Sequence, residues 1–178
     1  MKKLILFAGV LLIAVACNTT VTEQKAPEKV AINPADYPYQ LKEAYKDWQA
    51  GKQENAIMVL NMIKAWENKN AAECASYFAD TVMMNMDYFA GKMPNDSILS
   101  FVQEGYAKNE SIKVEMQDWE SVVSADGKDE WVTVWYKQTL VDKDGKSETL
   151  NIVNDAKIVN GKIAVFDEYV QHMPAEKE

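Results

Sequence analysis

The spacing of apolar residues changes from helical to strand-like between residues 56 and 87, and the rest of the chain is organised around this stretch. Apolar side chains first recur every three or four positions, which predicts a long helix with one buried face: Ala56, Val59, Leu60, Ile63 and Trp66. Asn70, with Glu73 three residues later, forms a capping-box pattern. It predicts a second, short helix whose apolar face is made by Ala71, Cys74, Ala75 and Phe78. Residues 81–84 are then predicted to form a strand.

Shorter patterns flank this stretch. Residues 40–50 are predicted to form a short amphipathic helix that ends at Gly51, with one face made by Leu41, Ala44, Tyr45 and Trp48. Residues 88–93 are predicted to form a turn, because a glycine and a proline punctuate them. Asp96 is predicted to cap a further helix over residues 97–108.

From residue 112 onward, apolar and polar residues alternate. Four segments rich in Val, Ile, Trp and Tyr are predicted strands: residues 112–123, 130–141, 148–159 and 162–171. Turn-forming residues separate them, and Asn160-Gly161 is the strongest hairpin signal in the chain. Consecutive hairpins that follow all the helices predict an α+β fold. In such a fold the N-terminal helices pack on one face of a strongly bent antiparallel sheet.

The first residues carry an export pattern. Lys2 and Lys3 precede an apolar run over residues 4–15 that is too short for a comfortable membrane span. Small residues then lead into Cys17, and this ending resembles the lipobox of bacterial lipoproteins. The resemblance implies cleavage before Cys17, acylation of Cys17, and a membrane-anchored lipoprotein of the bacterial cell envelope. The alternative is an ordinary secretory signal with an incidental cysteine.

These signals divide the chain into four parts. We predict a lipoprotein signal peptide over residues 1–16 and a lipid-anchored flexible tether with three prolines over residues 17–38. One globular domain over residues 39–174 and a charged tail over residues 175–178 follow.

Composition narrows the classes of function. The chain has a formal charge of −8 and no arginine, which argues against nucleic acid as a partner. With Cys17 lipidated, Cys74 is the remaining cysteine, so we predict no disulfide and a buried, inert thiol. His172 is the single histidine. We therefore predict no metal site, and we find no glycine-rich phosphate loop and predict no cofactor.

The order of the predicted elements resembles the nuclear-transport-factor-2-like superfamily, with its SnoaL-like and ketosteroid-isomerase-like branches nearest. The matching segments are residues 66–70, residues 75–80 and the hairpin at residues 160–163, and they anchor a resemblance over about residues 55–173. The resemblance implies a sheet that curls into a cone around a mostly apolar pocket closed by the helices. The same scaffold carries both enzymes and binders that catalyse nothing, so it does not by itself decide function.

The ketosteroid-isomerase-like branch implies positions for catalytic residues, and this chain departs from the pattern. The oxyanion tyrosine falls on Met62 and the carboxylate base falls near Met84, with Asp87 close but displaced. The oxyanion carboxyl falls on Asn154. An amide can donate a hydrogen bond to an oxyanion, but it cannot replace a base.

The resemblance also implies that the strand face with Asn154 points into the cone, together with Leu150, Ile152, Ala156 and Ile158. The same face of the next strand then holds Ala164, Phe166, Glu168, Val170 and His172. A carboxylate among apolar neighbours is costly to bury, so Glu168 is a candidate functional group. The alternatives are that Glu168 lies at a wet mouth, or that a bulge turns it outward and Asp167 takes its place.

Methionine and tryptophan gather in the predicted core elements. The methionines around the central stretch are either core packing or an adaptable ligand-binding wall. Trp131 and Trp135 share one strand face, with Trp119 on the preceding strand. They either pack under the helices or form a patch for a partner. The resemblance implies that a homodimer through this sheet is plausible.

Three hypotheses follow for function. The first is a lipid-anchored protein that binds a small, mainly apolar molecule without transforming it. Asn154, Glu168 and Tyr88 would orient the ligand, and Met62 and Phe166 would contact it. The second is an isomerase, cyclase or hydro-lyase with Glu168, Asp87 or His172 as catalytic candidates. The third is a protein-docking scaffold. The incomplete catalytic set favours binding over catalysis.

Overall fold

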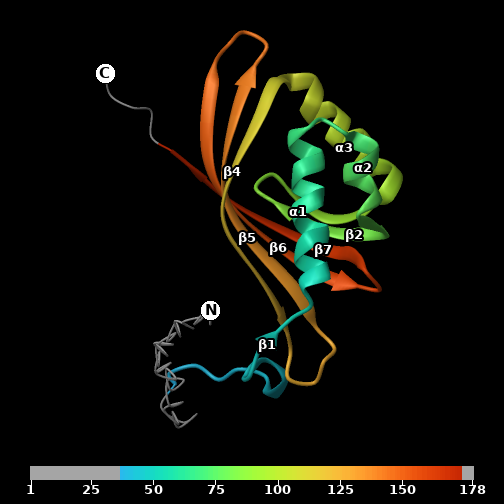
Figure 1. Ribbon diagram of the computed structural model, residues 1–178, viewed down its shortest axis with the longest axis vertical. Helices are drawn as coiled ribbons and strands as arrows, with labels where there is room; N and C mark the ends of the chain where they lie inside the picture. The colour runs from blue at the N-terminus through green and yellow to red at the C-terminus, as the bar shows by residue number, and fades with distance from the viewer. Residues whose placement is uncertain (1–36, 174–178) are drawn as a thin grey trace, which may run out of the picture. The chain divides into compact units, whose positions relative to one another are not determined.

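The computed structural model of the protein describes residues 37–173 (Figure 1). The chain divides into two compact units after Tyr39, and the second unit carries all the elements labelled below. After a 3₁₀ turn at Glu43–Tyr45, the elements are β1 (Gln49–Ala50), α1 (Gln53–Glu67), α2 (Ala71–Ser76), β2 (Phe78–Met86), β3 (Phe89–Pro94), α3 (Asn95–Lys108), β4 (Asn109–Val123), β5 (Glu130–Asp142), β6 (Ser147–Val159) and β7 (Lys162–His172).

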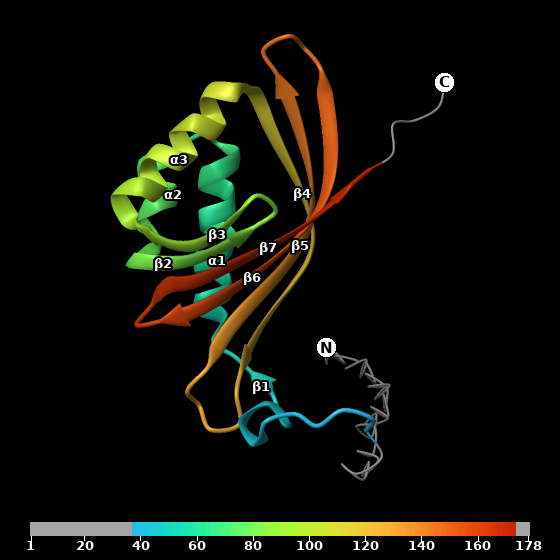
Figure 2. The same cartoon turned by 180° about the vertical axis from the view of Figure 1, so that it is seen from behind.

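The strands form one sheet in the order β1-β4-β5-β6-β7-β2-β3. Figures 1 and 2 show α1, α2 and α3 on one face of this twisted, curled sheet. The predicted α+β cone is confirmed, with two differences. The sheet curls without closing, since β1 and β3 are its edges. It is also mixed, because β2 pairs in parallel with β7 while the other neighbours are antiparallel.

The Asn70 cap and the Asn-Gly hairpin form as predicted, but the reciprocal half of the capping box does not: Glu73 accepts from the Asn70 side chain, and the Asn70 backbone N–H donates to the Ala65 carbonyl. The Glu73 backbone N–H donates to Asn70 Oδ1 over 3.3 Å, and Asn70 Nδ2 donates to Glu73 Oε2 over 2.7 Å. Asn160 and Gly161 both have positive φ, 51° and 71°. This is the backbone that a type I′ turn between two strands requires.

The predicted helix over residues 40–50 is wrong. In the structure this segment contains only the short 3₁₀ turn and β1, which pairs with the end of β4. Leu41 is 61% exposed and Trp48 is 40% exposed, so a helix here would have little core to bury its apolar face against. Gly51 instead donates its N–H to the Ser121 carbonyl at 2.7 Å. A Cβ at Gly51 would lie 2.4 Å from Ser121 Oγ, so the close strand pairing requires glycine.

Two further expectations between β2 and α3 are wrong. Residues 88–93 do not form a turn, because most of them belong to β3, which pairs with β2. An edge strand tolerates Gly91 and Pro94, since one side of its ladder is unpaired. Asp96 does not cap α3, which begins at Asn95 without a side-chain cap. Asn95 Nδ2 instead donates to the Ala75 carbonyl at 3.0 Å and ties α3 to α2.

The core fills the space between the helices and the sheet. Its centre consists of side chains with 0% exposure, namely Val59, Val82, Ile98, Val132, Val134, Ala156 and Ile163. Asn154 is also 0% exposed, although it is polar. This burial places a hydrogen-bonding group inside a mainly apolar interior, and the functional site is built around it.

The Asn70 cap gives the first prediction. We expect Asn70→Ala to lower the free energy of unfolding by about 1 kcal/mol, because α2 loses the acceptor for its Glu73 N–H. Urea unfolding followed by circular dichroism measures the change. Asn68→Ala, at the exposed end of α1, is the matched control and should cost less. Equal losses in the two variants would show that the cap contributes nothing of its own.

Candidate functional site

The register between β6 and β7 decides which side chains enter the cone. Asn154 lies directly opposite Glu168, and Ala156 lies opposite Phe166. A bulge follows, so that Ile158 is opposite Ile163, and Ile163 takes the fully buried inward place predicted for Ala164. Because the bulge lies toward the hairpin, Glu168 keeps the inward face shared with Asn154. Asp167 instead accepts a hydrogen bond from Asn85 Nδ2 at 2.6 Å.

A cavity of about 80 Å³ lies between the helices and this face of the sheet. Its wall is mostly apolar and aromatic, and includes Met62, Trp66, Phe78, Met84, Phe101 and Phe166. Phe166 packs edge-to-face on Phe78, with ring centroids 5.7 Å apart. The wall also contains the carboxyl group of Glu168 and the hydroxyl group of Tyr136.

A chain of hydrogen bonds runs along the sheet to Glu168. The buried Tyr136 hydroxyl donates to Asn154 Oδ1 at 2.7 Å, and Asn154 Nδ2 donates to Glu168 Oε2 at 3.3 Å. Burial raises the pKa of Tyr136 well above its usual value, so its hydroxyl keeps its proton and remains a donor. Each donor in the chain therefore points toward Glu168, and the carboxyl group is its terminal acceptor.

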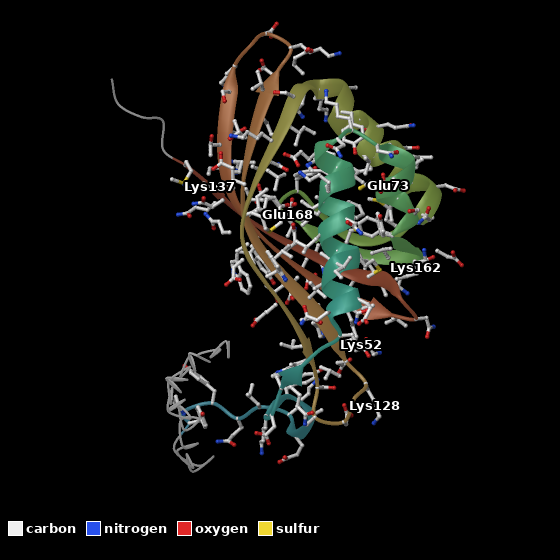
Figure 3. The ribbon with its side chains drawn as sticks, in the orientation of Figure 1. Lys52, Glu73, Lys128, Lys137, Lys162 and Glu168 are labelled. Carbon is white, nitrogen blue, oxygen red and sulfur yellow. The ribbon has the colours of Figure 1, made fainter. Side chains whose placement is uncertain are left out.

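The pKa of the Glu168 carboxyl group is shifted by its position in the site. Burial raises its pKa above the ordinary value, the Asn154 hydrogen bond opposes this shift, and the nearby charge of Asp87 adds to it. Figure 3 shows Glu168 at the centre of the molecule, where the sheet faces α1. A carboxyl group in this setting can accept a proton or bind a donor more readily than a solvated one.

A wider cleft of about 390 Å³ opens beside the cavity and shares Trp66, Met86, Phe101 and Glu168 with it. Part of its wall is made by apolar side chains of β5, β6 and β7, namely Leu140, Leu150, Ile152 and Val170. Charged and polar side chains make the rest, among them Asp87, Glu104, Lys108 and His172. Trp66 is held at the junction because its Nε1 donates to Gln138 Oε1 at 2.7 Å. Its ring also stacks on Tyr106 at 5.0 Å. The two spaces therefore adjoin at their four shared residues, and these contacts hold Trp66 in place there.

The remaining candidates lie at the rim of the cleft. His172 is exposed, with Nδ1 3.1 Å from Glu148 Oε1 and Nε2 3.7 Å from Asp87 Oδ2, rather than facing Glu168. Its pKa is raised, chiefly by the hydrogen bond to Glu148. Tyr88 is 73% exposed and lies beside Phe101, with ring centroids 6.3 Å apart. Asp87, Tyr88 and His172 therefore line the entrance, whereas Met62 and Phe166 line the cavity.

Three residues of the site were missed by the sequence analysis: Trp66, Tyr136 and Gln138. A signal for two of them was present. Tyr136 and Gln138 lie two and four positions after the buried Val134 on β5. Side chains at this spacing share one face of a strand, so both were expected to face the interior. Trp66 was assigned to the apolar face of α1, but its hydrogen bond to Gln138 follows only from how α1 crosses β5.

The predicted patch and thiol can also be placed. Trp131 and Trp135 lie on the face of β5 away from the helices, where both are half-buried, and Lys157 lies 5.8 Å above the Trp131 ring. They do not pack under the helices. Trp119 is 46% exposed. Cys74 is buried, and burial raises its pKa to about 12, so its thiol stays protonated.

Within residues 37–173, no cluster of three or more histidine, cysteine or acidic side chains is arranged to hold a metal ion. None of the helices in this range has the length and hydrophobicity to cross a membrane. Cys17 and most of the predicted tether lie outside the described residues.

Comparison with known proteins supports the fold. No family model matches the sequence, and no curated protein matches it. The structure is similar to a hypothetical protein with a ketosteroid-isomerase-like fold from Catenulispora acidiphila, solved in complex with trimethylamine (TM-score 0.53, 15% identity, 63% of this chain and 83% of that chain).

Two further solved structures show the same likeness. One is an LEH-like epoxide hydrolase from M. tuberculosis (TM-score 0.55, 12% identity, 67% of this chain and 84% of that chain). The other is a nuclear-transport-factor-2-like protein of unknown function from Burkholderia pseudomallei (TM-score 0.55, 14% identity, 66% of this chain and 91% of that chain). The domain therefore has the nuclear-transport-factor-2-like, ketosteroid-isomerase-like fold, as the sequence predicted.

The burial of Glu168 gives the second prediction. A raised folded-state pKa stabilises the protein below the ordinary pKa, and this contribution is lost as pH rises through the folded value. Glutamine keeps the acceptor for Asn154 but carries no charge. We expect Glu168→Gln to raise the free energy of unfolding at pH 7 by ~1 kcal/mol, with the gain vanishing below about pH 4.

Urea unfolding across pH 3.5–8 measures this difference. Glu120→Gln, on the exposed opposite face of the sheet, is the matched control and should leave the stability within about 0.5 kcal/mol of wild type. A constant offset between Glu168→Gln and wild type at every pH would contradict the assignment.

Proposed function

We propose that the protein is a lipid-anchored component of the bacterial cell envelope whose cone binds a small, mainly apolar molecule. The observation that carries this proposal is the apolar cavity beside the wider cleft, with Glu168 in the wall of both. Apolar walls with a few convergent polar groups are typical of small-molecule sites. In such a site the walls supply contact area, and the Tyr136–Asn154–Glu168 chain orients the ligand.

Binding is favoured over isomerase chemistry by two side chains of the cavity wall. Met62 occupies the position that the family resemblance implies for the oxyanion tyrosine, and Met84 lies near the position implied for the base; both line the cavity. A thioether neither donates a proton nor removes one at neutral pH. The site therefore lacks the pair of groups on which that mechanism depends.

A second candidate function is an enzyme with Glu168 as general base. The observation that favours it is the raised pKa of a carboxyl group that contacts both the cavity and the cleft. General bases work best when their pKa lies near the working pH. Conversion of a bound ligand that stops in Glu168→Gln would favour this function over simple binding.

Assembly through the outer face of the sheet is a separate part of the proposal. Trp131 and Trp135 alternate with buried residues of β5, so they face away from the cone. A homodimer that covers them would be consistent with the family resemblance, and a docked envelope protein is the alternative. Sedimentation of wild type against Trp135→Lys distinguishes a dimer from a monomer.

The anchor gives the third prediction. We expect radiolabelled palmitate to be incorporated into the wild-type protein in a bacterial host and to be absent from Cys17→Ser, since the thiol is the acceptor in lipoprotein processing. Cys74→Ser is the matched control and should keep the label, because that thiol is buried. Detergent phase partition should move Cys17→Ser from the detergent phase to the aqueous phase. Equal labelling of both variants would refute the anchor.

The cavity gives the fourth prediction. We expect native mass spectrometry of the Cys17→Ser protein, purified gently from its own host, to show a reproducible added mass. Met62→Trp should remove it by filling the cavity, whereas Ile57→Trp, at a position 56% exposed on the outside of α1, should keep it. A bare mass in every preparation, or an adduct that survives in Met62→Trp, would contradict binding in this cavity.

A further inference from the structure

We propose that the molecule held by the cone is an amphiphile with one cationic amino head, and that this head lies in the cavity against Glu168. This inference rests on the proposed binding function and names the chemical class of its ligand. Four observations carry it: the direction of the hydrogen bonds, the nature of the wall, the charges at the entrance and the sizes of the two spaces.

The direction of the hydrogen bonds decides what the cavity can recognise. The Tyr136 hydroxyl donates its hydrogen to Asn154 Oδ1, and the Asn154 amide donates a hydrogen to Glu168 Oε2. The Trp66 indole N–H donates to Gln138 Oε1. The strong donors along the wall are thus already paired with protein acceptors, and the carboxyl group of Glu168 remains as an acceptor. A ligand carbonyl or carboxylate would find no strong donor there, while a ligand N–H would find a carboxylate.

The rest of the wall also favours positive charge. Aromatic rings present their negative faces to a cation, and thioether sulfurs are polarizable. The cavity combines both kinds of group, in Phe78, Phe101, Phe166, Met62 and Met84. No lysine or histidine among residues 37–173 lines this cavity, so an anion would have no counter-charge in it. An ammonium group would have Glu168 as its counter-charge.

The entrance carries the same preference. Asp87, Glu104 and Glu168 line the cleft, against the single lysine Lys108 and the histidine His172. His172 already lies between Glu148 and Asp87, so its charge is offset locally. The whole chain is acidic, at −8. A cation is therefore attracted toward the cleft and an anion is repelled from it.

The sizes of the two spaces assign the two ends of the ligand. The cavity of about 80 Å³ accepts a head group of a few heavy atoms. The cleft of about 390 Å³, with Leu140, Leu150, Ile152 and Val170 in its wall, accepts a hydrocarbon tail. Burial of that tail supplies roughly 0.8 kcal/mol per methylene, and the ion pair with Glu168 selects the head.

The test compares three probes that share one tail: octylamine, 1-octanol and octanoate. Isothermal titration calorimetry on the Cys17→Ser protein at pH 7 should give octylamine the tightest binding, about tenfold tighter than 1-octanol, with octanoate weakest. Glu168→Gln should weaken octylamine by about tenfold and leave 1-octanol unchanged. Glu120→Gln, on the outer face of the sheet, should leave all three affinities unchanged.

Each other outcome has a definite meaning. Equal binding of the three probes, or a preference for octylamine that survives in Glu168→Gln, overturns the cationic head while binding in the cone stands. No binding of any probe, with circular dichroism showing a folded protein, overturns the binding function itself. Met62→Trp provides a second check, since filling the cavity should weaken octylamine in a protein that keeps Glu168.

Discussion

The pairing of Asn154 with Glu168 across β6 and β7 is the constraint on which the site depends. Side chains on neighbouring strands share a face only in the correct register, and a slip of one residue would exchange Glu168 for Asp167. The bulge between β6 and β7 lies between this pair and the hairpin. The register is therefore regular beside the cavity, and Asn154 and Glu168 keep their inward face. Asn154 can be fully buried because Tyr136 and Glu168 satisfy both ends of its amide.

The helices turn this polar strand face into a recess. Gly105 of α3 lies so close to Trp66 that a Cβ there would be 2.7 Å from its ring. This close approach, together with the Trp66–Gln138 hydrogen bond, fixes α1 and α3 over the sheet. Packing is therefore tight around the indole, and the unfilled space lies beside it, lined by flexible methionines. The cavity and the ordered junction result from the same arrangement of helices.

Much of the fold could be predicted from local patterns, and the failures have a common cause. The helix at Asn70, the four long strands and the Asn160-Gly161 turn depend on nearby residues, and all of them form. The helix predicted over residues 40–50 is wrong because the segment ends in β1, which pairs with the distant end of β4. The turn predicted over residues 88–93 is wrong because most of these residues pair with β2, the strand directly before them. In the site, the family resemblance implied the inward face of Asn154, and strand alternation extended that face to Glu168. Strand alternation could not show that Asp87 and His172 lie at the rim, because their positions depend on how three strand ends meet.

The polarity of the buried chain separates this cone from one built to stabilise an oxyanion. An oxyanion site needs donors that point into the empty space, whereas here Tyr136 and Asn154 direct their hydrogens along the sheet to a carboxyl group. Met62 and Met84 line the cavity at or near the two positions where the family resemblance implies an oxyanion tyrosine and a base. Two thioethers and a terminal acceptor leave a scaffold whose chemistry favours holding a donor over transforming a carbonyl compound. The direction of a few hydrogen bonds thus distinguishes the interior of this cone from an oxyanion site.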